Sequence, residues 1–149
     1  MTRIAVDGID AAGKTTLADQ LGVLLRAQRM CIDDFLRPED ERYARGVDSP
    51  EGYYEDSFDF AAFRAAVLAA TGTVVADGVF LQRPELDDLW DLRIWVDVSF
   101  EESLRRAEIR DAHYMDDVRG RYERRYHPGQ RLYLAQINPR SRADVVVPS

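Results

Sequence analysis

Cysteine is almost missing from this chain, since Cys31 is the only one among 149 residues. A single thiol excludes an intrachain disulfide and a zinc site made of cysteines. Long apolar runs are missing too, because none approaches the roughly 20 residues that a membrane-spanning helix needs. The opening segment MTRIAVDGID contains no apolar core of a signal peptide. We therefore expect a cytoplasmic protein without a membrane partner.

Positive charge is also in short supply. Asp and Glu outnumber Lys and Arg by 27 to 20, which gives a net charge of −7. We do not expect such a chain to bind nucleic acid through general electrostatics, because that binding depends on neutralising phosphates. The charge is uneven, however, since eight arginines lie between Arg105 and Arg131. A local anion site is therefore compatible with the sequence.

The residues that are present suit one globular domain, residues 1–149. The chain is 46% hydrophobic and 32% charged, and its length fits the usual size of about 100–200 residues per domain. Apolar runs predict short strands at 3–7, 30–32, 73–76, 92–98 and 143–147. Apolar spacing predicts helices at about 15–28, around 60–68, after Ser99 (a capping-box pattern with Glu102), and at 117–137 with an interruption at Pro128-Gly129. This alternation predicts an α/β fold with a mostly parallel sheet.

Acidic residues follow three of the expected strands. They are Asp7-Gly8, Asp33-Asp34 and Asp77-Gly78. In open α/β sheets the ligand crevice lies at the carboxyl ends of the strands. The three acidic segments are therefore expected to meet at one place.

Residues 8–15, GIDAAGKT, match the phosphate-binding loop motif G-x-x-x-x-G-K-[ST], with an expected strand before it and a helix after it. The glycines allow the backbone to wrap and to direct its N–H groups at phosphate oxygens. The N-terminal end of the following helix adds positive potential. We expect ATP and Mg²⁺ to bind here, through Gly8, Asp10, Ala11, Ala12, Gly13, Lys14, Thr15 and Thr16.

Lys14 is the only lysine, although the chain contains 19 arginines. The loop needs a compact cation on a thin stem that reaches between the β- and γ-phosphates, and a planar guanidinium would be too wide. We therefore assign Lys14 to catalysis as well as to binding. The Thr15 hydroxyl is our candidate for a Mg²⁺ ligand.

The chain resembles the uridine kinase-like branch of the P-loop small-molecule kinases, which includes nicotinamide riboside kinase and bacterial pantothenate kinase. The resemblance extends over nearly the whole chain and rests on GIDAAGKTTLA, IDDFLRP, VVADGVFL, RRAEIRD, and RYHPG followed by ADVVVP. It implies the P-loop NTPase fold, a five-stranded mostly parallel sheet flanked by helices, with a short lid at about residues 105–115. It also implies an ATP-dependent phosphotransferase that acts on a hydroxyl of a nucleoside, uridine or cytidine.

The resemblance implies roles for two acidic residues. Asp33 matches the residue that faces the acceptor hydroxyl, where a carboxylate orients the nucleophile and accepts its proton. Asp77 matches the acidic residue that holds Mg²⁺, and its side chain, shorter than the usual glutamate, favours a contact through water. The alternative for Asp33 is a turn or a helix cap, and for Asp77 a strand-end Asp-Gly turn.

The segment GYYEDSFDF, residues 52–60, lies where the family binds its acceptor. Asp56 is our candidate for hydrogen bonds to sugar hydroxyls, and Tyr53 or Tyr54 for stacking on a base. The alternative is a helix start, with Asp56 or Ser57 as the N-cap and the tyrosines in a packing role.

Three arginines in RRAEIRD match the lid arginines of the family: Arg105, Arg106 and Arg110. Arg106 and Arg110 lie one helical turn apart. We expect Arg106 to bind nucleotide and Arg110 to stabilise transition-state charge. The alternative is a solvated helix face on which these arginines pair with Glu101, Glu102 and Glu108.

Three functions compete at this stage: a small-molecule kinase, a P-loop ATPase or switch without an acceptor, and a kinase-like binding module that has lost activity. A GTPase is excluded, because its base-reading N-K-x-D element would need a second lysine. The acceptor is open among nucleosides, nicotinamide riboside, pantothenate and sugars. The oligomeric state is open as well, with a homo-oligomer among the choices.

Overall fold

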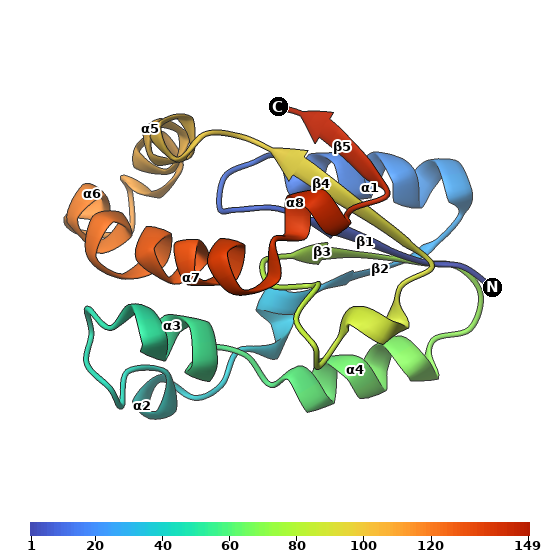
Figure 1. The fold of residues 1–149 in the computed structure, drawn as a ribbon, viewed down its shortest axis with the longest axis horizontal. Coiled ribbons are helices and arrows are strands. Elements are labelled where there is room, and N and C mark those ends of the chain that lie inside the picture. The colour runs from blue at the N-terminus through green and yellow to red at the C-terminus, as the bar shows by residue number, and fades with distance from the viewer.

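Five parallel strands form the centre of the molecule. The computed structural model describes residues 1–149, and its sheet has the order β2-β3-β1-β4-β5 (Figure 1). The strands are β1 Arg3–Asp7, β2 Gln28–Cys31, β3 Val74–Gly78, β4 Leu92–Asp97 and β5 Val145–Pro148. Every pairing between neighbouring strands is parallel. The predicted α/β fold with a five-stranded sheet is therefore confirmed.

Helices connect the strands. The helices are α1 Lys14–Leu25, α2 Glu39–Arg42, α3 Pro50–Asp56, α4 Phe60–Ala69, α5 Phe100–Asp111, α6 Val118–Arg121, α7 His127–Ile137 and α8 Pro139–Arg142. Two short 3-10 turns, η1 Ile32–Phe35 and η2 Asp87–Leu89, and a π-helical segment, η3 Tyr122–Tyr126, complete the chain. None of the helices is both long enough and apolar enough to cross a membrane.

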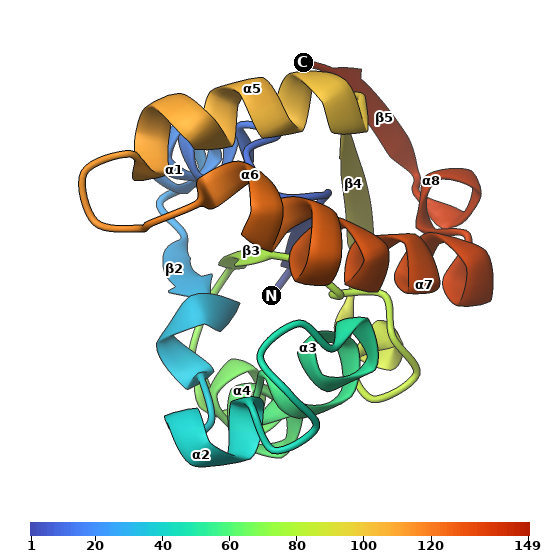
Figure 2. The ribbon, with the colours of Figure 1, turned by 90° about the vertical axis from the view of Figure 1, so that its left-hand side faces the viewer.

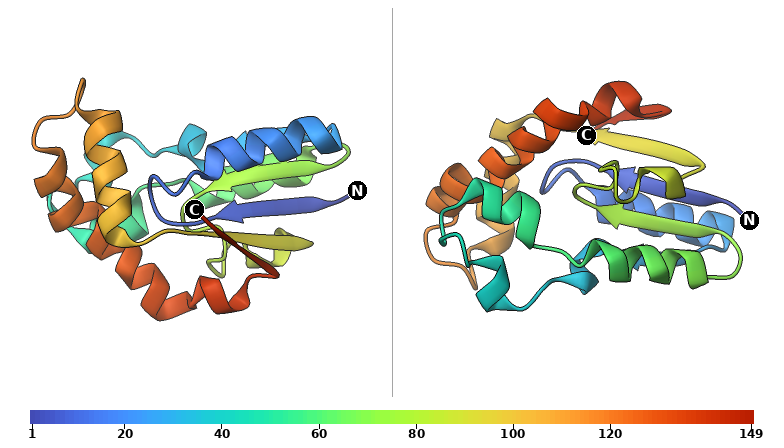
Figure 3. Two further views of the ribbon diagram at one scale, coloured as in Figure 1. Left: turned by 90° about the horizontal axis from the view of Figure 1, so that it is seen from above. Right: turned by 60° about the horizontal axis from the view of Figure 1, so that its bottom comes forward.

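The helices cover the two faces of the sheet unequally. Figure 3 shows α1 on one face and α7 with α8 on the other. The α1 face holds a small core in which Ala18 packs against Val6, Val75 and Val96. The opposite face holds the larger core, to which α3, α4 and α7 contribute Tyr54, Phe63 and Tyr133 among others. The central strands β1, β3 and β4 are largely buried on both faces, which explains why their sequences are mostly continuous apolar runs rather than alternating ones.

The carboxyl ends of the strands point toward two groups of helices. Figure 2 looks at these ends, with α5, α6 and α7 above them and α2 and α3 below. The helix α5 begins as the sequence predicts, because the Ser99 Oγ accepts a hydrogen bond from the backbone N–H of Glu102 at 3.1 Å. The second half of the capping box is missing. The Glu102 carboxylate binds Arg105 and Arg106 instead of the N-cap backbone.

The predicted interruption at Pro128-Gly129 is wrong. The helix α7 begins at His127 and places Pro128 in its first turn, where a missing N–H costs little. The irregular segment lies before it, in the wider turns of η3. Gly129 serves close packing rather than a break, because a Cβ there would lie 2.5 Å from the Tyr53 ring.

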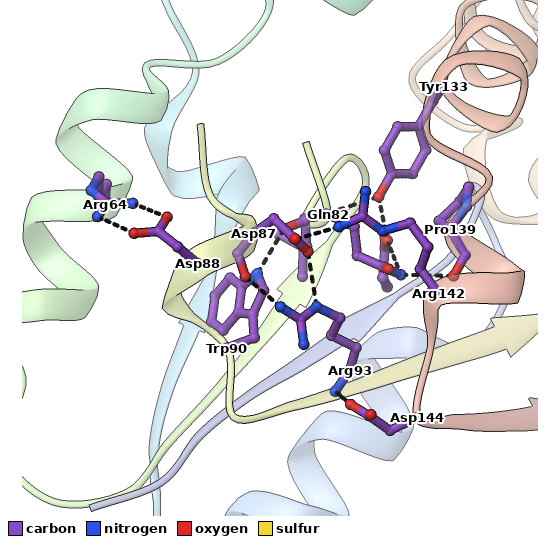
Figure 4. A network of polar contacts seen from close by, with 12 residues as sticks. Arg64, Gln82, Asp87, Asp88, Trp90, Arg93, Tyr133, Pro139, Arg142 and Asp144 are labelled. Atoms are coloured by element: carbon purple, nitrogen blue, oxygen red, sulfur yellow. Dashed lines mark hydrogen bonds and ion pairs between the residues drawn. The ribbon is translucent and has the colours of Figure 1, made fainter. Parts of the chain in front are cut away.

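The long connection from β3 to β4 is tied down by polar contacts (Figure 4). The Trp90 indole donates to the carbonyl of Leu81 at 2.7 Å. Asp87 accepts from Arg93 of β4 at 2.8 Å and also pairs with Arg142 of α8. These contacts hold the connection against the sheet, and with it the end of β3 that reaches the cavity described below.

Candidate active site

The loop between β1 and α1 has the backbone of an anion-binding site. Ala11 and Gly13 have positive φ angles of 57° and 95°, which turn successive N–H groups toward one concave side. Gly8 allows a close approach, because a Cβ there would lie 2.8 Å from the carbonyl oxygen of Val96. The glycines of the motif are therefore required by the geometry that the loop adopts.

A cavity of about 370 Å³ opens at this loop, at the carboxyl ends of the strands. Its lining consists of Asp10, Ala11, Ala12, Gly13, Lys14, Thr15, Thr16, Asp33, Asp77, Gly78, Val79, Arg106 and Arg110. The cavity brings together the loop, both predicted acidic residues and two of the three predicted arginines. Besides Arg105, four predicted site residues do not line it: Gly8, Tyr53, Tyr54 and Asp56.

Lys14 lies at the base of the cavity. Its ammonium donates a hydrogen bond to the carbonyl of Ile9 at 2.6 Å, and only 9% of the residue is exposed. The contact ties the side chain to its own loop, where a slender stem fits. A cation at this point favours the binding of phosphate oxygens.

Thr15 and Asp77 form the candidate metal site. The Thr15 hydroxyl donates to Asp77 Oδ2 at 2.9 Å, and hydroxyl and carboxylate oxygens are ligands that Mg²⁺ accepts. No cluster of three or more metal-binding side chains is present. Mg²⁺ is usually held by one or two carboxylates together with substrate phosphates and water, and Thr15 and Asp77 offer oxygens of the types that this ion binds.

Arg29 is a neighbour of this site that sequence analysis missed. Its guanidinium pairs with Asp77 Oδ1 at 2.8 Å and also binds Asp19. The contact leaves Asp77 Oδ2, which Thr15 already touches, as the oxygen nearest the loop. No local signal indicated this pair, because Arg29 lies just before the expected strand 30–32 and Asp77 follows 48 positions later in the chain.

Asp33 stands on η1, directly after β2, and its side chain is exposed in the cavity. Although the side chain is exposed to solvent, the walls of the cavity exclude part of its hydration, and this desolvation raises the pKa of Asp33. The negative charges of Asp10 and Asp77 raise the pKa further, and Lys14 opposes the shift. A carboxylate with a raised pKa is a better proton acceptor. The residue is therefore suited in position and in basicity to receive a proton from a hydroxyl group.

The predicted arginines have different surroundings. Arg106 reaches the loop, donating to the carbonyl of Ala11 at 3.2 Å while it pairs with Glu102. Arg110 lines the cavity and binds Asp111 at 2.8 Å. Arg105 pairs with Glu102 on the outer side of α5 and does not line the cavity. The alternative interpretation, a solvated helix face with arginine–glutamate pairs, therefore holds for Arg105 and in part for Arg106. It does not hold for Arg110, whose partner is none of the three expected glutamates.

The residues predicted to bind the acceptor lie in α3. The rings of Tyr53 and Tyr54 are buried and meet Phe80 edge to face, with centroids 5.3 and 5.0 Å away. Neither ring presents an open face to the cavity. Asp56 pairs with Arg45 at 2.8 Å. It ends α3, so its alternative role as an N-cap is wrong, and Asp59 caps α4 instead.

Asp7, the first of the three acidic residues expected at the strand ends, is buried beneath the loop and does not line the cavity. Asp7 is fully buried and accepts hydrogen bonds from the Tyr133 hydroxyl at 2.5 Å, from Gln82 and from the backbone N–H of Gly8. Burial outweighs these donors and raises the pKa of Asp7 to about 6. The partners lie far away in the chain, so no local pattern indicated this network.

Known proteins provide a comparison for this geometry. No family model matches the chain. A possible uridine kinase from Bacillus stearothermophilus superposes with a TM-score of 0.76 at 23% identity, covering 98% of this chain and 88% of that one. The shikimate kinase from Acinetobacter baumannii superposes with a TM-score of 0.62 at 17% identity, covering 100% and 84%. The chain has the fold of the P-loop kinases.

A gluconokinase from Sinorhizobium meliloti, at 18% identity and a TM-score of 0.57, covers 83% of the chain and 72% of its own length. The names of these proteins point to different small acceptors. The P-loop kinase fold is therefore common to the chain and to these proteins.

Proposed function

We propose that the protein is an ATP-dependent kinase that phosphorylates a hydroxyl group of a small molecule, with a nucleoside as the first candidate. The observation that carries the proposal is the single cavity in which the phosphate loop, the Thr15–Asp77 pair and Asp33 meet. A structural glycine turn would not require an acidic residue on a neighbouring strand to reach the same space. A kinase requires it, because the acceptor hydroxyl must lie beside the γ-phosphate.

In the proposed reaction, the loop N–H groups and Lys14 bind the phosphates of ATP. Bound Mg²⁺ would neutralise phosphate charge, and Thr15 and Asp77 are the residues that would hold it. The acceptor oxygen forms a bond to the γ-phosphorus while the bond to the β–γ bridging oxygen breaks. The hydroxyl proton passes to Asp33, and ADP leaves with the former bridging oxygen.

Arg106 and Arg110 would act on the charge of the transferred group. Both reach the cavity from α5, one helical turn apart. The side chain of Arg110 is half-exposed, and its partner Asp111 is its neighbour in the sequence, so exchanging this partner for a phosphate oxygen requires only a local movement. This supports a lid role for residues 105–115.

The nucleoside preference rests on the resemblance to the uridine kinase-like branch. Asp56 stays our candidate for a sugar hydroxyl, since its ion pair with Arg45 is partly exposed and open to exchange. Stacking of a base on Tyr53 or Tyr54 would require α3 to shift, because both rings are packed. Nicotinamide riboside, pantothenate and sugars are the alternative acceptors.

The test is ATP consumption by the purified protein, measured alone and with uridine, cytidine, nicotinamide riboside, pantothenate and a set of sugars. A kinase should turn over ATP much faster with one acceptor, and mass spectrometry should find that acceptor phosphorylated. The matched control is Asp33→Asn, which keeps the phosphate loop intact. ATP hydrolysis at one rate with every compound would instead indicate a P-loop ATPase or switch.

A further inference from the structure

The phosphate loop of this protein contains an acidic residue, Asp10, and the structure holds that residue at three points. The Asp10 backbone N–H donates to Gln130 Oε1 at 3.2 Å. Gln130 Nε2 in turn donates to the Asp10 carboxylate at 2.8 Å. The hydroxyl of Ser103 donates to the Asp10 carbonyl at 2.5 Å. Two helices that lie far from the loop in the sequence, α5 and α7, therefore fix one residue of the loop.

The orientation of the Gln130 amide follows from its partners. A backbone N–H can only donate, so the amide oxygen must face Asp10 N. The amide nitrogen then faces the carboxylate, and its second hydrogen points to the Tyr53 hydroxyl at 3.3 Å. Gln130 is 1% exposed, so water does not compete for these bonds. Two of the three hydrogen bonds of the Gln130 side chain therefore hold Asp10.

Ser103 is fixed in the same way. Its one hydroxyl hydrogen goes to the Asp10 carbonyl, so the Nε2 of His127, 3.0 Å away, must be the donor toward Ser103. Burial lowers the pKa of His127 to about 4, which keeps the ring neutral near pH 7. His127 packs edge to face on Phe100 and Tyr122, in agreement with a structural role.

A carboxylate in a phosphate loop works against the function of the loop. Asp10 lines the cavity beside Lys14, and phosphate oxygens bound there would be repelled by a second negative charge at short range. The other variable positions of the loop, Ile9, Ala11 and Ala12, are uncharged. The charge of Asp10 must therefore be held in a fixed direction if nucleotide is to bind well.

We propose that Gln130 is a positioning residue that holds the Asp10 carboxylate toward α7 and away from the bound phosphates. The proposal rests on the proposed nucleotide-binding function. The donated amide hydrogen stabilises the carboxylate on the α7 side, and the accepted backbone N–H sets the path of the loop. Without Gln130 the carboxylate can rotate into the cavity.

The test compares ATP affinity, measured by calorimetry with Mg²⁺ present, for the wild type, Gln130→Ala, Asp10→Asn and the double variant. We expect Gln130→Ala to weaken ATP binding about tenfold, which corresponds to about 1.4 kcal/mol. Asp10→Asn keeps the loop backbone that binds phosphate and removes only the negative charge, so it should bind ATP more tightly than the wild type. The double variant should return to within about threefold of Asp10→Asn, since no charge is left to restrain.

Ser103→Ala is the matched control, because it removes a bond to the same residue but leaves the carboxylate held. Any weakening by Ser103→Ala should persist when Asp10→Asn is added. If Gln130 had a purely structural role, the loss of ATP affinity in Gln130→Ala would also persist when Asp10→Asn is added. A double variant that binds ATP as weakly as Gln130→Ala would therefore overturn the proposal. Normal ATP binding by Gln130→Ala would overturn it too.

The proposed function and this inference fail in different ways. A wild-type chain that binds no ATP would overturn both. A second outcome separates them: ATP binds, and the double variant recovers ATP affinity as expected, but no acceptor is phosphorylated. This outcome would overturn the proposed kinase activity and would support the role of Gln130.

Discussion

Asp33 is the residue whose chemistry the proposed reaction depends on most. We expect Asp33→Asn to lower turnover at least about a hundredfold, the lower range for a general base. The ATP affinity should change little, because Asp33 belongs to η1 rather than to the phosphate loop. Steady-state kinetics and ATP calorimetry check the two expectations. If Asp33→Asn instead loses ATP affinity while its residual turnover stays normal, Asp33 would be assigned to the metal site.

The raised pKa of Asp33 also predicts the pH dependence of turnover in the wild type. A base works in its ionised form, so turnover should fall on the acid side at a pH above the ordinary aspartate pKa of about 3.9. The residual activity of Asp33→Asn should lack this acid limb.

Asp7 predicts a pH dependence of stability. Its folded pKa, about 6, lies above the ordinary 3.8, so the native state binds the proton more tightly than the unfolded state. The free energy of unfolding should therefore fall as the pH rises from about 4 to 6, by roughly 3 kcal/mol at most, and this contribution should be constant above 6. Asp7→Asn cannot ionise and should lose this fall. Urea unfolding at pH 4 and pH 7 measures it, and equal pH dependence in both proteins would refute the burial argument.

At the scale of elements, the C-terminal half of α5 is where the proposed lid lies. Arg110→Ala should lower turnover by roughly 10³-fold, the lower end for arginines that stabilise phosphoryl transfer. Nucleotide affinity without acceptor should change much less, since Arg110 binds Asp111 and Tyr122 in this structure. Hydrogen exchange across residues 105–115 should slow when an ATP analogue and the acceptor bind together.

Arg105→Ala is the control for that prediction. Arg105 lies on the same helix as Arg110 and pairs with Glu102, but it does not line the cavity. This substitution should leave turnover close to that of the wild type. Near-normal turnover in Arg110→Ala, together with hydrogen exchange that does not change when ligands bind, would contradict the lid. It would support the interpretation of this segment as a solvated helix face.

The contact between α3 and α7 sets two effects against each other. Gly→Ala inside a helix usually stabilises by about 1 kcal/mol. At Gly129, however, the added Cβ would lie 2.5 Å from the Tyr53 ring and 3.1 Å from the Pro50 carbonyl. Overpacking costs about 1–3 kcal/mol, and here backbone lies close by and cannot yield as a flexible side chain can. We expect Gly129→Ala to lower the free energy of unfolding in urea denaturation, and a gain in stability would show that α7 can move away from α3.

At the scale of the whole molecule, nucleotide and metal should stabilise the fold. A ligand at 100 times its Kd adds about 2.7 kcal/mol, which for a chain of this length raises Tm by roughly 5 to 10 °C. ATP with Mg²⁺ should produce this shift, and EDTA should reduce it. Asp77→Asn should still bind ATP, but its Tm should rise by nearly the same amount with and without Mg²⁺. An equal shift with and without EDTA would contradict the metal role of Thr15 and Asp77.

Much of the fold could be predicted, because its signals are local. Strands β1, β3, β4 and β5 are centred on short apolar runs, and GIDAAGKT contains its glycines, its lysine and its threonine within eight residues. The rule that ligands lie at the carboxyl ends of parallel strands then placed Asp33 and Asp77 near the loop, and both line the cavity. Errors arose where packing overrides a local signal, as at Gly129, which reads as a helix break and serves a close helix contact.

The sequence by itself determined the phosphate loop, the parallel sheet and the identity of the acidic residues at its edge, since these depend on neighbours a few positions away. Only the tertiary structure decided which charges pair and which polar groups are buried. Arg29 of β2 reaches Asp77 on the neighbouring strand β3, and Asp10 meets Gln130 from 120 positions away. Such contacts depend on which strands pair and on how α7 packs over the sheet, a balance of many weak interactions that no short pattern contains.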